Sequence, residues 1–269
     1  MKPQDFFLYI HALFRYNNAM KTTASANRYN LIDAIRALAI ISMVTFHLCY
    51  DIFIVYGVDG GFPYYPGVIV WERSICSTFI FVSGISLNFS RHAVRRGIIV
   101  NLCGLIISLV MLIFMPSQQI WFGVLNLIGC SMLITCALRK PLGHIPSLVG
   151  MLVSFLLFSF LYGVPNGYVG FFKTQLAVLP SALYFTDFLA PVGLPSLGFR
   201  SSDYFPLIPW LFLFICGWFF WRFIKEHEWD GVFRFNIPVL SFIGRYSLII
   251  YMAHQPILYL ICAAIFGHF

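Results

Sequence analysis

The chain has 269 residues, of which 60% are hydrophobic and only 10% are charged, with a mean hydropathy of +0.84. Ordinary soluble domains carry about 25% charged residues, so this composition excludes a soluble domain and indicates an integral membrane protein. The net charge of +7 is explained by basic loops on one side of the membrane, and no nucleic-acid partner is expected.

Seven continuous apolar stretches predict an all-α integral membrane protein, a polytopic helical bundle. They lie at about 32–55, 66–89, 97–115, 121–138, 146–163, 205–224 and 239–266. A weaker apolar stretch, 176–192, is interrupted by two prolines and could form a short re-entrant segment. Residues 1–30 are predicted to be a polar or interfacial leader, with Met20 as an alternative start, and residues 31–269 to be one transmembrane domain.

The basic residues predict which side of the membrane each loop occupies. With the N-terminus in the cytoplasm, 14 of the 17 Lys and Arg residues fall in cytoplasmic segments or helix ends, all except Arg73, Lys173 and Arg200. We therefore expect the N-terminus inside and the C-terminus outside. This places a long loop, about 164–204, on the outer side, where its length and aromatic content predict a structured lid.

The first apolar stretch carries ionisable side chains that align on one helical face. Counted at about 100° per residue, they fall within a strip about 60° wide: Asp33, Arg36, His47 and Asp51. The strip is about 27 Å long at 1.5 Å per residue, which is enough to connect the two membrane faces. Because each charge near the bilayer centre costs roughly 2.5–3.5 kcal/mol, such groups normally face a protein interior or a watery cavity.

His47 is the deepest of these groups and the candidate catalytic residue. Its imidazole can take and return a proton near neutral pH. Asp51 lies one helical turn further on, where its carboxylate could fix the tautomer of the ring, so the pair predicts a base with an orienting carboxylate. The competing interpretation is a satisfied core histidine, which the alignment of the strip disfavours. Asp33 and Arg36 lie at the cytoplasmic end, where snorkelling alone would explain them.

Other polar residues inside or beside the predicted spans have two interpretations each. Hydrogen bonds and ion pairs between helices would explain them as packing groups, and the same residues could line a substrate site. They are Arg73 beside Glu72, Asn126 in WFGVLNLIG, Asp203 in SSDYFPLIPW, Arg245 in GRYSL, and His254 and Gln255 before Pro256. Asp203 could also cap the helix that follows it.

Several blocks resemble, in the same order, the bacterial proteins related to the catalytic domain of heparan-alpha-glucosaminide N-acetyltransferase. The blocks are LIDAIRALAIISMVTFH followed by YD, ERSICSTFIFVSGISL, WFGVLNLIGCSMLI, DYFPLIPWLFLFICGW and GRYSLIIYMAHQPIL. The resemblance covers about residues 30–265. The spacing of Arg36 and His47 is also similar to the first-helix R-x10-H of the broader transmembrane acyltransferases, which O-acetylate cell-envelope sugars.

The resemblance implies transfer of an acyl group, typically acetyl, from cytoplasmic acetyl-CoA to a glycan or lipid-linked sugar on the outer side of a bacterial inner membrane. By position, His47 would be the general base or acyl-handling histidine, and Arg36 would lie near the CoA entrance. CoA phosphates could bind where the strip meets the cytoplasm, at Asp33 and Arg36. The motif positions matched in the other spans are Arg73, Asp203, Arg245, His254 and Gln255, together with Asp51. No metal is expected.

The sequence also departs from this family at three positions. Asn126 stands where a histidine is expected, Tyr246 where a histidine is common, and Ala37 where a glycine is usual. Asn126 therefore keeps open a non-catalytic membrane subunit. A proton-coupled transporter is the other alternative, with a relay of His47, Asp51 and His254, although no internal repeat is visible. The acceptor, the acyl chain length and the assembly, a homodimer among the possibilities, are not determined.

Overall fold

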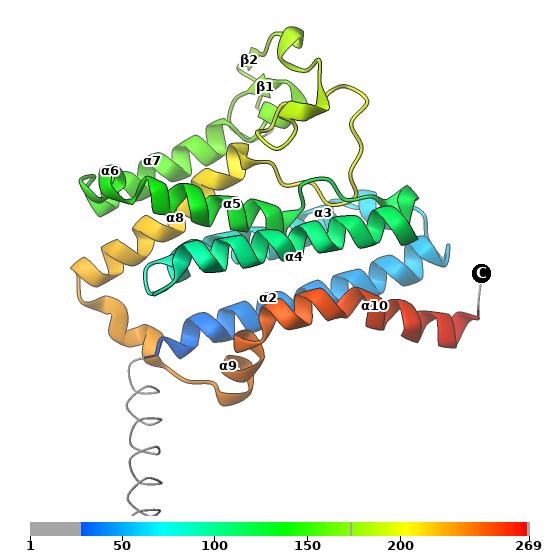
Figure 1. Cartoon of the computed structure of the whole chain (residues 1–269), viewed down its shortest axis with the longest axis horizontal. Coiled ribbons are helices and arrows are strands. Elements are labelled where there is room, and N and C mark those ends of the chain that lie inside the picture. The colour runs from blue at the N-terminus through cyan, green and yellow to red at the C-terminus, as the bar shows by residue number, and fades with distance from the viewer. Residues whose placement is uncertain (1–27, 173, 268–269) are drawn as a thin grey trace, which may run out of the picture.

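The computed structural model describes residues 28–172 and 174–267, and most of them are helical (Figure 1). Six helical segments in this part of the chain are long and apolar enough to cross a membrane. The protein is therefore a polytopic helical membrane protein, as the sequence predicts. The predicted leader lies outside the described residues, apart from its last three positions.

The first three long helices follow the predicted spans closely. Helix α2 (Asn30–Tyr50) continues into one π-helical turn (Asp51–Val55), α3 covers Pro66–Leu87, and α4 covers Ala93–Phe114. Proline is suited to the first turn of α3, because the N–H it lacks has no partner there in any helix.

The later helices differ from prediction in two places. The stretch predicted at 121–138 forms α5 (Val124–Ala137), which has 14 residues and is shorter than the six long segments. The stretch predicted as one span at 239–266 is two helices, α9 (Pro238–Arg245) and α10 (Ser247–Phe266). Between α5 and α9 in the chain lie the short α6 (Arg139–Gly143), α7 (Ser147–Phe160) and α8 (Leu207–Glu226).

Helix α8 forms the centre of the apolar core. Its buried aromatic residues, including Phe214 and Phe219, pack with Ile80 of α3 and Leu127 of α5. Two glycines allow α8 to approach α3 closely. A Cβ at Gly84 would meet the backbone carbonyl of Phe214, and one at Gly217 would meet that of Phe81. Small residues at such crossings let the backbones of membrane helices pack directly against each other.

The chain between α7 and α8 forms a cap at one end of the bundle (Figure 1). It contains a two-residue antiparallel pair, β1 (Tyr168–Val169) with β2 (Ala177–Val178), and short 3-10 turns. The stretch 176–192 is thus built of β2 and these turns instead of a re-entrant helix. The Tyr184 hydroxyl donates to the carbonyl of Val164, which ties the cap to the end of α7.

The remaining packing divides the bundle into two sides joined by α3. The main partners of α10 are α2 and α9, whereas α4 packs mainly on α5. Helix α3 contacts α2, α5 and α8. Helices α10 and α4 are not major packing partners of each other. A cavity lies between them, and residues of α3 form part of its lining.

Candidate functional site

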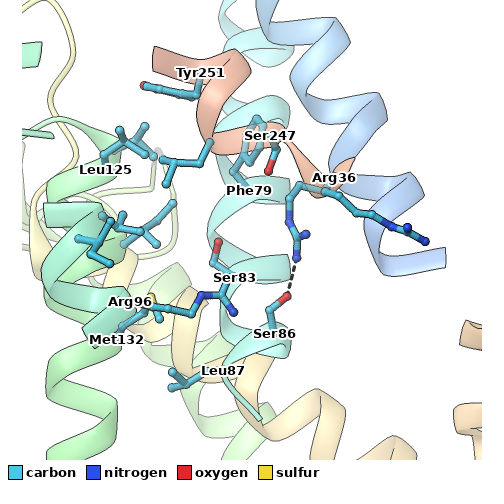
Figure 2. Close-up of a pocket in the computed structure, with 16 residues that line it drawn as sticks. Arg36, Phe79, Ser83, Ser86, Leu87, Arg96, Leu125, Met132, Ser247 and Tyr251 are labelled. Atoms are coloured by element: carbon cyan, nitrogen blue, oxygen red, sulfur yellow. Dashed lines mark hydrogen bonds between the residues drawn. The ribbon is translucent and has the colours of Figure 1, made fainter. Parts of the chain in front are cut away.

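A cavity of about 190 Å³ lies between the two sides, at the end of the bundle where α2 and α10 begin. It is lined by residues from α2, α3, α4, α5, α9 and α10, of which ten are labelled in Figure 2. One wall is polar and carries Arg36 and Arg245. The opposite wall carries Arg96 of α4 together with apolar residues, among them Leu125 and Met132 of α5.

Arg36 is fixed in the polar wall by neighbours on two helices. Its Nη1 donates to the Asp33 carboxylate at 2.8 Å, and its Nη2 donates to the Ser86 hydroxyl at 2.7 Å (Figure 2). Arg28 donates to the second oxygen of Asp33 at 2.8 Å. The predicted cytoplasmic end of the polar strip therefore forms a connected network, with a guanidinium held at the edge of the cavity.

The other two arginines have no such acidic partner in the described part of the chain. Arg245 donates to the side-chain oxygen of Asn30 at 3.3 Å, and no carboxylate lies within ion-pair distance of Arg245 or Arg96. Figure 2 shows Arg96 extending from α4 toward Ser83, on the side of the cavity opposite Arg36. Arg96 is one of the 14 basic residues that the sequence assigns to the cytoplasmic side, where setting the topology would explain it. Its position in the wall, facing other cations, indicates an anion-binding cavity.

A close helix crossing sets the position of Arg245. Gly244 lies directly against α2, where a Cβ would collide with the backbone carbonyl of Asp33. The Ser241 hydroxyl donates to the carbonyl of Asn30 at 3.1 Å in the same crossing. The interruption between α9 and α10 thus holds Arg245 beside the first turn of α2.

The half of the interface between α2 and α10 that lies away from the cavity contains a histidine pair. The ring centroids of His47 and His254 are 4.9 Å apart. Nδ1 of His254 lies 2.7 Å from the backbone oxygen of Tyr251, which can only accept, so this nitrogen carries a proton. In the neutral ring Nε2 is then unprotonated, and it is buried without a hydrogen-bond partner. The structure therefore gives His47 a partner on another helix.

Asp51 bonds to Gln255 instead of to His47. Gln255 Nε2 donates to Asp51 Oδ1 at 2.9 Å, and no hydrogen bond joins Asp51 and His47 in the described structure. The expected base and orienting carboxylate are thus not hydrogen-bonded to each other, and the donor that Asp51 Oδ1 has comes from α10. Asp51 is also the first residue of the π-helical turn, a distortion that often occurs at functional sites.

Three of the predicted site residues lie apart from the interface of α2 and α10, around the start of α5: Arg73, Asp203 and Asn126. Arg73 stacks over the ring of Phe205, with its guanidinium carbon 5.4 Å from the centroid. Asp203 accepts from the backbone N–H of Val124 at 3.2 Å, so it caps α5 and not the helix that follows it in sequence. Burial raises the pKa of the Asp203 carboxyl to about 6.

Asn126, where the family resemblance suggested histidine, packs between helices. Its Nδ2 donates to Asn101 Oδ1 of α4 at 2.9 Å, and the residue is 3% exposed. This is the hydrogen-bonding role that packing predicts for an asparagine between membrane helices. Asparagine in place of the expected histidine at position 126 therefore affects the interface of α4 and α5 and not the pair of His47 and His254.

Tyr251 connects these groups and was not singled out from the sequence. It lines the large cavity and also a space of about 10 Å³ beside Asn126 and Asp203. Its ring lies 5.6 Å from that of His254, and its carbonyl fixes the tautomer of that ring. The signal in the sequence is the spacing YMAH, which places Tyr251 one helical turn before His254.

Comparison with known proteins gives one match. The family model described as Heparan-alpha-glucosaminide N-acetyltransferase, catalytic, matches residues 28–256. This range contains the histidine pair, Asp51, Gln255 and the cavity lined by Arg36, Arg96 and Arg245, which we call the arginine cavity. No curated protein and no solved structure matches the chain significantly.

Proposed function

Because this chain belongs to the family of the catalytic domain of heparan-alpha-glucosaminide N-acetyltransferase, we propose that it is a membrane-embedded acetyltransferase. It takes the acetyl group from acetyl-CoA on the cytoplasmic side and transfers it to a glycan or lipid-linked sugar on the outer side of a bacterial inner membrane. The observation that carries the proposal is that the arginine cavity and the histidine pair lie along the same two helices, α2 and α10, with Tyr251 lining the cavity and packing against His254.

The arginine cavity is suited to the phosphates of CoA. Guanidinium groups bind phosphate through several charge-assisted hydrogen bonds, and Arg96 and Arg245 have no carboxylate in the described residues to compete for them. Arg36, held by Asp33 and Ser86, would contribute a third cation with its geometry already fixed.

The distance from this cavity to the histidines matches the shape of the donor. His47 is eleven residues beyond Arg36 on a regular helix, which corresponds to about 16 Å along the axis. The pantetheine arm of CoA is an extended chain that can cover such a distance. With its phosphates at the arginines, the arm would run past Tyr251 and place the thioester near His47.

His47 then acts as the base in the transfer step. The acceptor oxygen or nitrogen bonds to the acetyl carbon as its proton passes to the imidazole. The carbon–sulfur bond breaks, and the CoA sulfur leaves and receives that proton, so that acetylated acceptor and free CoA are formed. His254, in ring contact with His47, orients the base. Asp51 lies one turn further out and helps to position the acceptor.

The test is acetyl transfer by purified protein. The protein in detergent is supplied with radiolabelled acetyl-CoA and simple sugars, and the labelled sugar is separated and counted. General base catalysis contributes about 10²–10⁴-fold, so His47→Gln should lower the rate by at least about 100-fold. The matched control is His144→Gln, an exposed histidine bonded to the backbone of Lys140.

Two results would refute the proposal. Equal rates for His47→Gln and wild type would remove His47 from the mechanism. A wild-type protein that neither binds acetyl-CoA nor transfers acetyl would instead be a non-catalytic subunit, or a transporter if it moved a sugar into liposomes without CoA.

A further inference from the structure

Three hydrogen-bond acceptors are buried together without a partner in the half of the interface between α2 and α10 that contains the histidine pair. They are Asp51 Oδ2, His254 Nε2 and Gln255 Oε1. Asp51 is 2% exposed and His254 is 8% exposed, so neither side chain is freely hydrated from the surface. A buried polar atom left unsatisfied costs about 1–3 kcal/mol, which makes three of them at one level of the bundle unusual.

Each of these atoms is an acceptor for an identifiable reason. Gln255 uses its amide nitrogen to donate to Asp51, which leaves its carbonyl oxygen free. An ionised carboxylate can only accept, and the second oxygen of Asp51 has nothing to accept from. His254 donates from Nδ1 to the Tyr251 carbonyl, so its Nε2 is a lone-pair nitrogen in the neutral ring. The described protein therefore offers these three acceptors no donor.

The three acceptors lie close to the histidine base and to breaks in both helices. Asp51 is four residues after His47 on α2, and His254 and Gln255 are neighbours on α10. The π-helical turn begins at Asp51. Pro256 lacks an N–H, so the regular hydrogen bond to the carbonyl of Met252 is missing from α10. At this level the interface has a surplus of acceptors in both side chains and backbone.

We propose that Asp51, His254 and Gln255 form the binding subsite for the acceptor substrate, and that this substrate is recognised as a donor of several hydrogen bonds. A sugar fits this chemistry, because its hydroxyl groups, and the ammonium of an amino sugar, can reach an ionised carboxylate and two neutral acceptors at once. The inference rests on the proposed function, since it assumes that the donor arrives from the arginine cavity at the opposite end of α2.

The position of the subsite agrees with approach from the outer side. Asp51 begins the π-helical turn that follows α2, and this turn ends at Val55, about 6 Å further along the axis. A sugar bound to Asp51 and Gln255 would lie one helical turn beyond His47, where one of its hydroxyl or amino groups can reach the imidazole. Asp51 thus positions the acceptor and does not orient the base.

Binding of model sugars tests the inference without requiring turnover. Tritiated glucosamine is bound to purified wild-type protein in a scintillation-proximity assay and displaced by methyl glucoside or by its permethylated form, which has no donors. We expect methyl glucoside to displace the label and the permethylated sugar to fail. Absence of glucosamine binding, or equal displacement by the two glucosides, would overturn the inference.

Two variants locate the subsite. Asp51→Asn replaces one acceptor oxygen by a donor, and should weaken glucosamine binding about tenfold, as expected for loss of a charge-assisted hydrogen bond. Gln255→Met keeps the length of the side chain and removes its polar atoms, so it should also weaken glucosamine binding. This second variant tests the subsite even if Asp51→Asn proves unstable. The matched control is Asp187→Asn on the exposed cap, which should bind glucosamine as wild type does.

The binding of acetyl-CoA separates this inference from the proposed function. Asp51→Asn should leave the acetyl-CoA dissociation constant within about twofold of wild type, while it raises the KM for the acceptor. If wild type transfers acetyl and both subsite variants keep wild-type glucosamine binding and acceptor KM, the subsite is wrong and the proposed function stands. If wild type binds no acetyl-CoA, the proposed function fails, and the sugar-binding comparison still decides the subsite.

Discussion

Replacing Arg96 by glutamine should weaken acetyl-CoA binding without unfolding the protein. The side chain extends from α4 into the arginine cavity and has no carboxylate partner in the described residues (Figure 2). Its removal therefore breaks no ion pair and leaves no buried charge. Glutamine keeps a hydrogen-bonding side chain and removes only the charge and the second arm of the guanidinium.

The size of the effect follows from the contact that is lost. A hydrogen bond to a charged group contributes about 1.5–3 kcal/mol, and each 1.4 kcal/mol changes an equilibrium constant tenfold. Arg96 is exposed, so solvent screens it, and the lower end of this range applies. We therefore expect the dissociation constant for acetyl-CoA to rise about tenfold at low ionic strength, and less at high salt.

Isothermal titration calorimetry of detergent-purified protein with acetyl-CoA measures this change. The neighbouring Arg95→Gln is the matched control, because Arg95 is also exposed on α4 but does not line the cavity. The same loss of affinity in both variants would mean that only the overall positive charge attracts CoA. An unchanged affinity in Arg96→Gln would remove the cavity as the phosphate site.

Two further predictions concern the scaffold of the site. Gly244→Ala should lower the melting temperature and weaken acetyl-CoA binding, since a Cβ there collides with the carbonyl of Asp33 and overpacking costs about 1–3 kcal/mol. The control Gly143→Ala should do neither, because a Cβ at Gly143 meets no atom. For Asp203, a folded pKa of about 6 against an ordinary 3.8 means that the folded state holds the proton more tightly. Stability should therefore fall as pH rises from about 4 to 6 and level off above, and chemical denaturation of Asp203→Asn across this range should show no such fall. The same fall in the variant as in wild type would contradict the assignment.

The parts of the fold that depend on local sequence could be predicted well. A helix that crosses a membrane satisfies its backbone within one segment, so continuous apolar runs reveal most helix positions. The break at Tyr246 was missed because the apolar residues on both sides of Gly244, Arg245 and Ser247 were combined into one span. At this break Gly244 lies directly against α2, which is a contact between distant segments that local sequence does not reveal.

The candidate site shows the same limit. The helical period alone aligned Arg36, His47 and Asp51, because these residues share one helix. Their partners could not be inferred, since the period does not say which helix lies opposite. Asp51 bonds Gln255, more than 200 positions away in sequence, and His47 contacts His254. The position of Arg96 in the cavity could not be inferred for the same reason, because the sequence shows only a basic pair with Arg95 before an apolar stretch.

The structure favours one of the two interpretations that the sequence left open for Asn126, the packing one. A missing histidine suggested a loss of catalytic groups. In the structure Asn126 bonds Asn101 within the interface of α4 and α5, while a second histidine, His254, stands beside His47. The substitution is therefore compatible with a two-histidine site.

The most direct test of the central claim is acetyl transfer across a sealed membrane. Proteoliposomes of known protein orientation receive radiolabelled acetyl-CoA on the side of the arginine cavity, with glucosamine trapped on the other side. The account predicts labelled sugar in the opposite compartment for wild type and for His144→Gln, and a rate at least about 100-fold lower for His47→Gln. Labelled sugar that forms only when acetyl-CoA and acceptor share one compartment, or at an equal rate in His47→Gln, would contradict it.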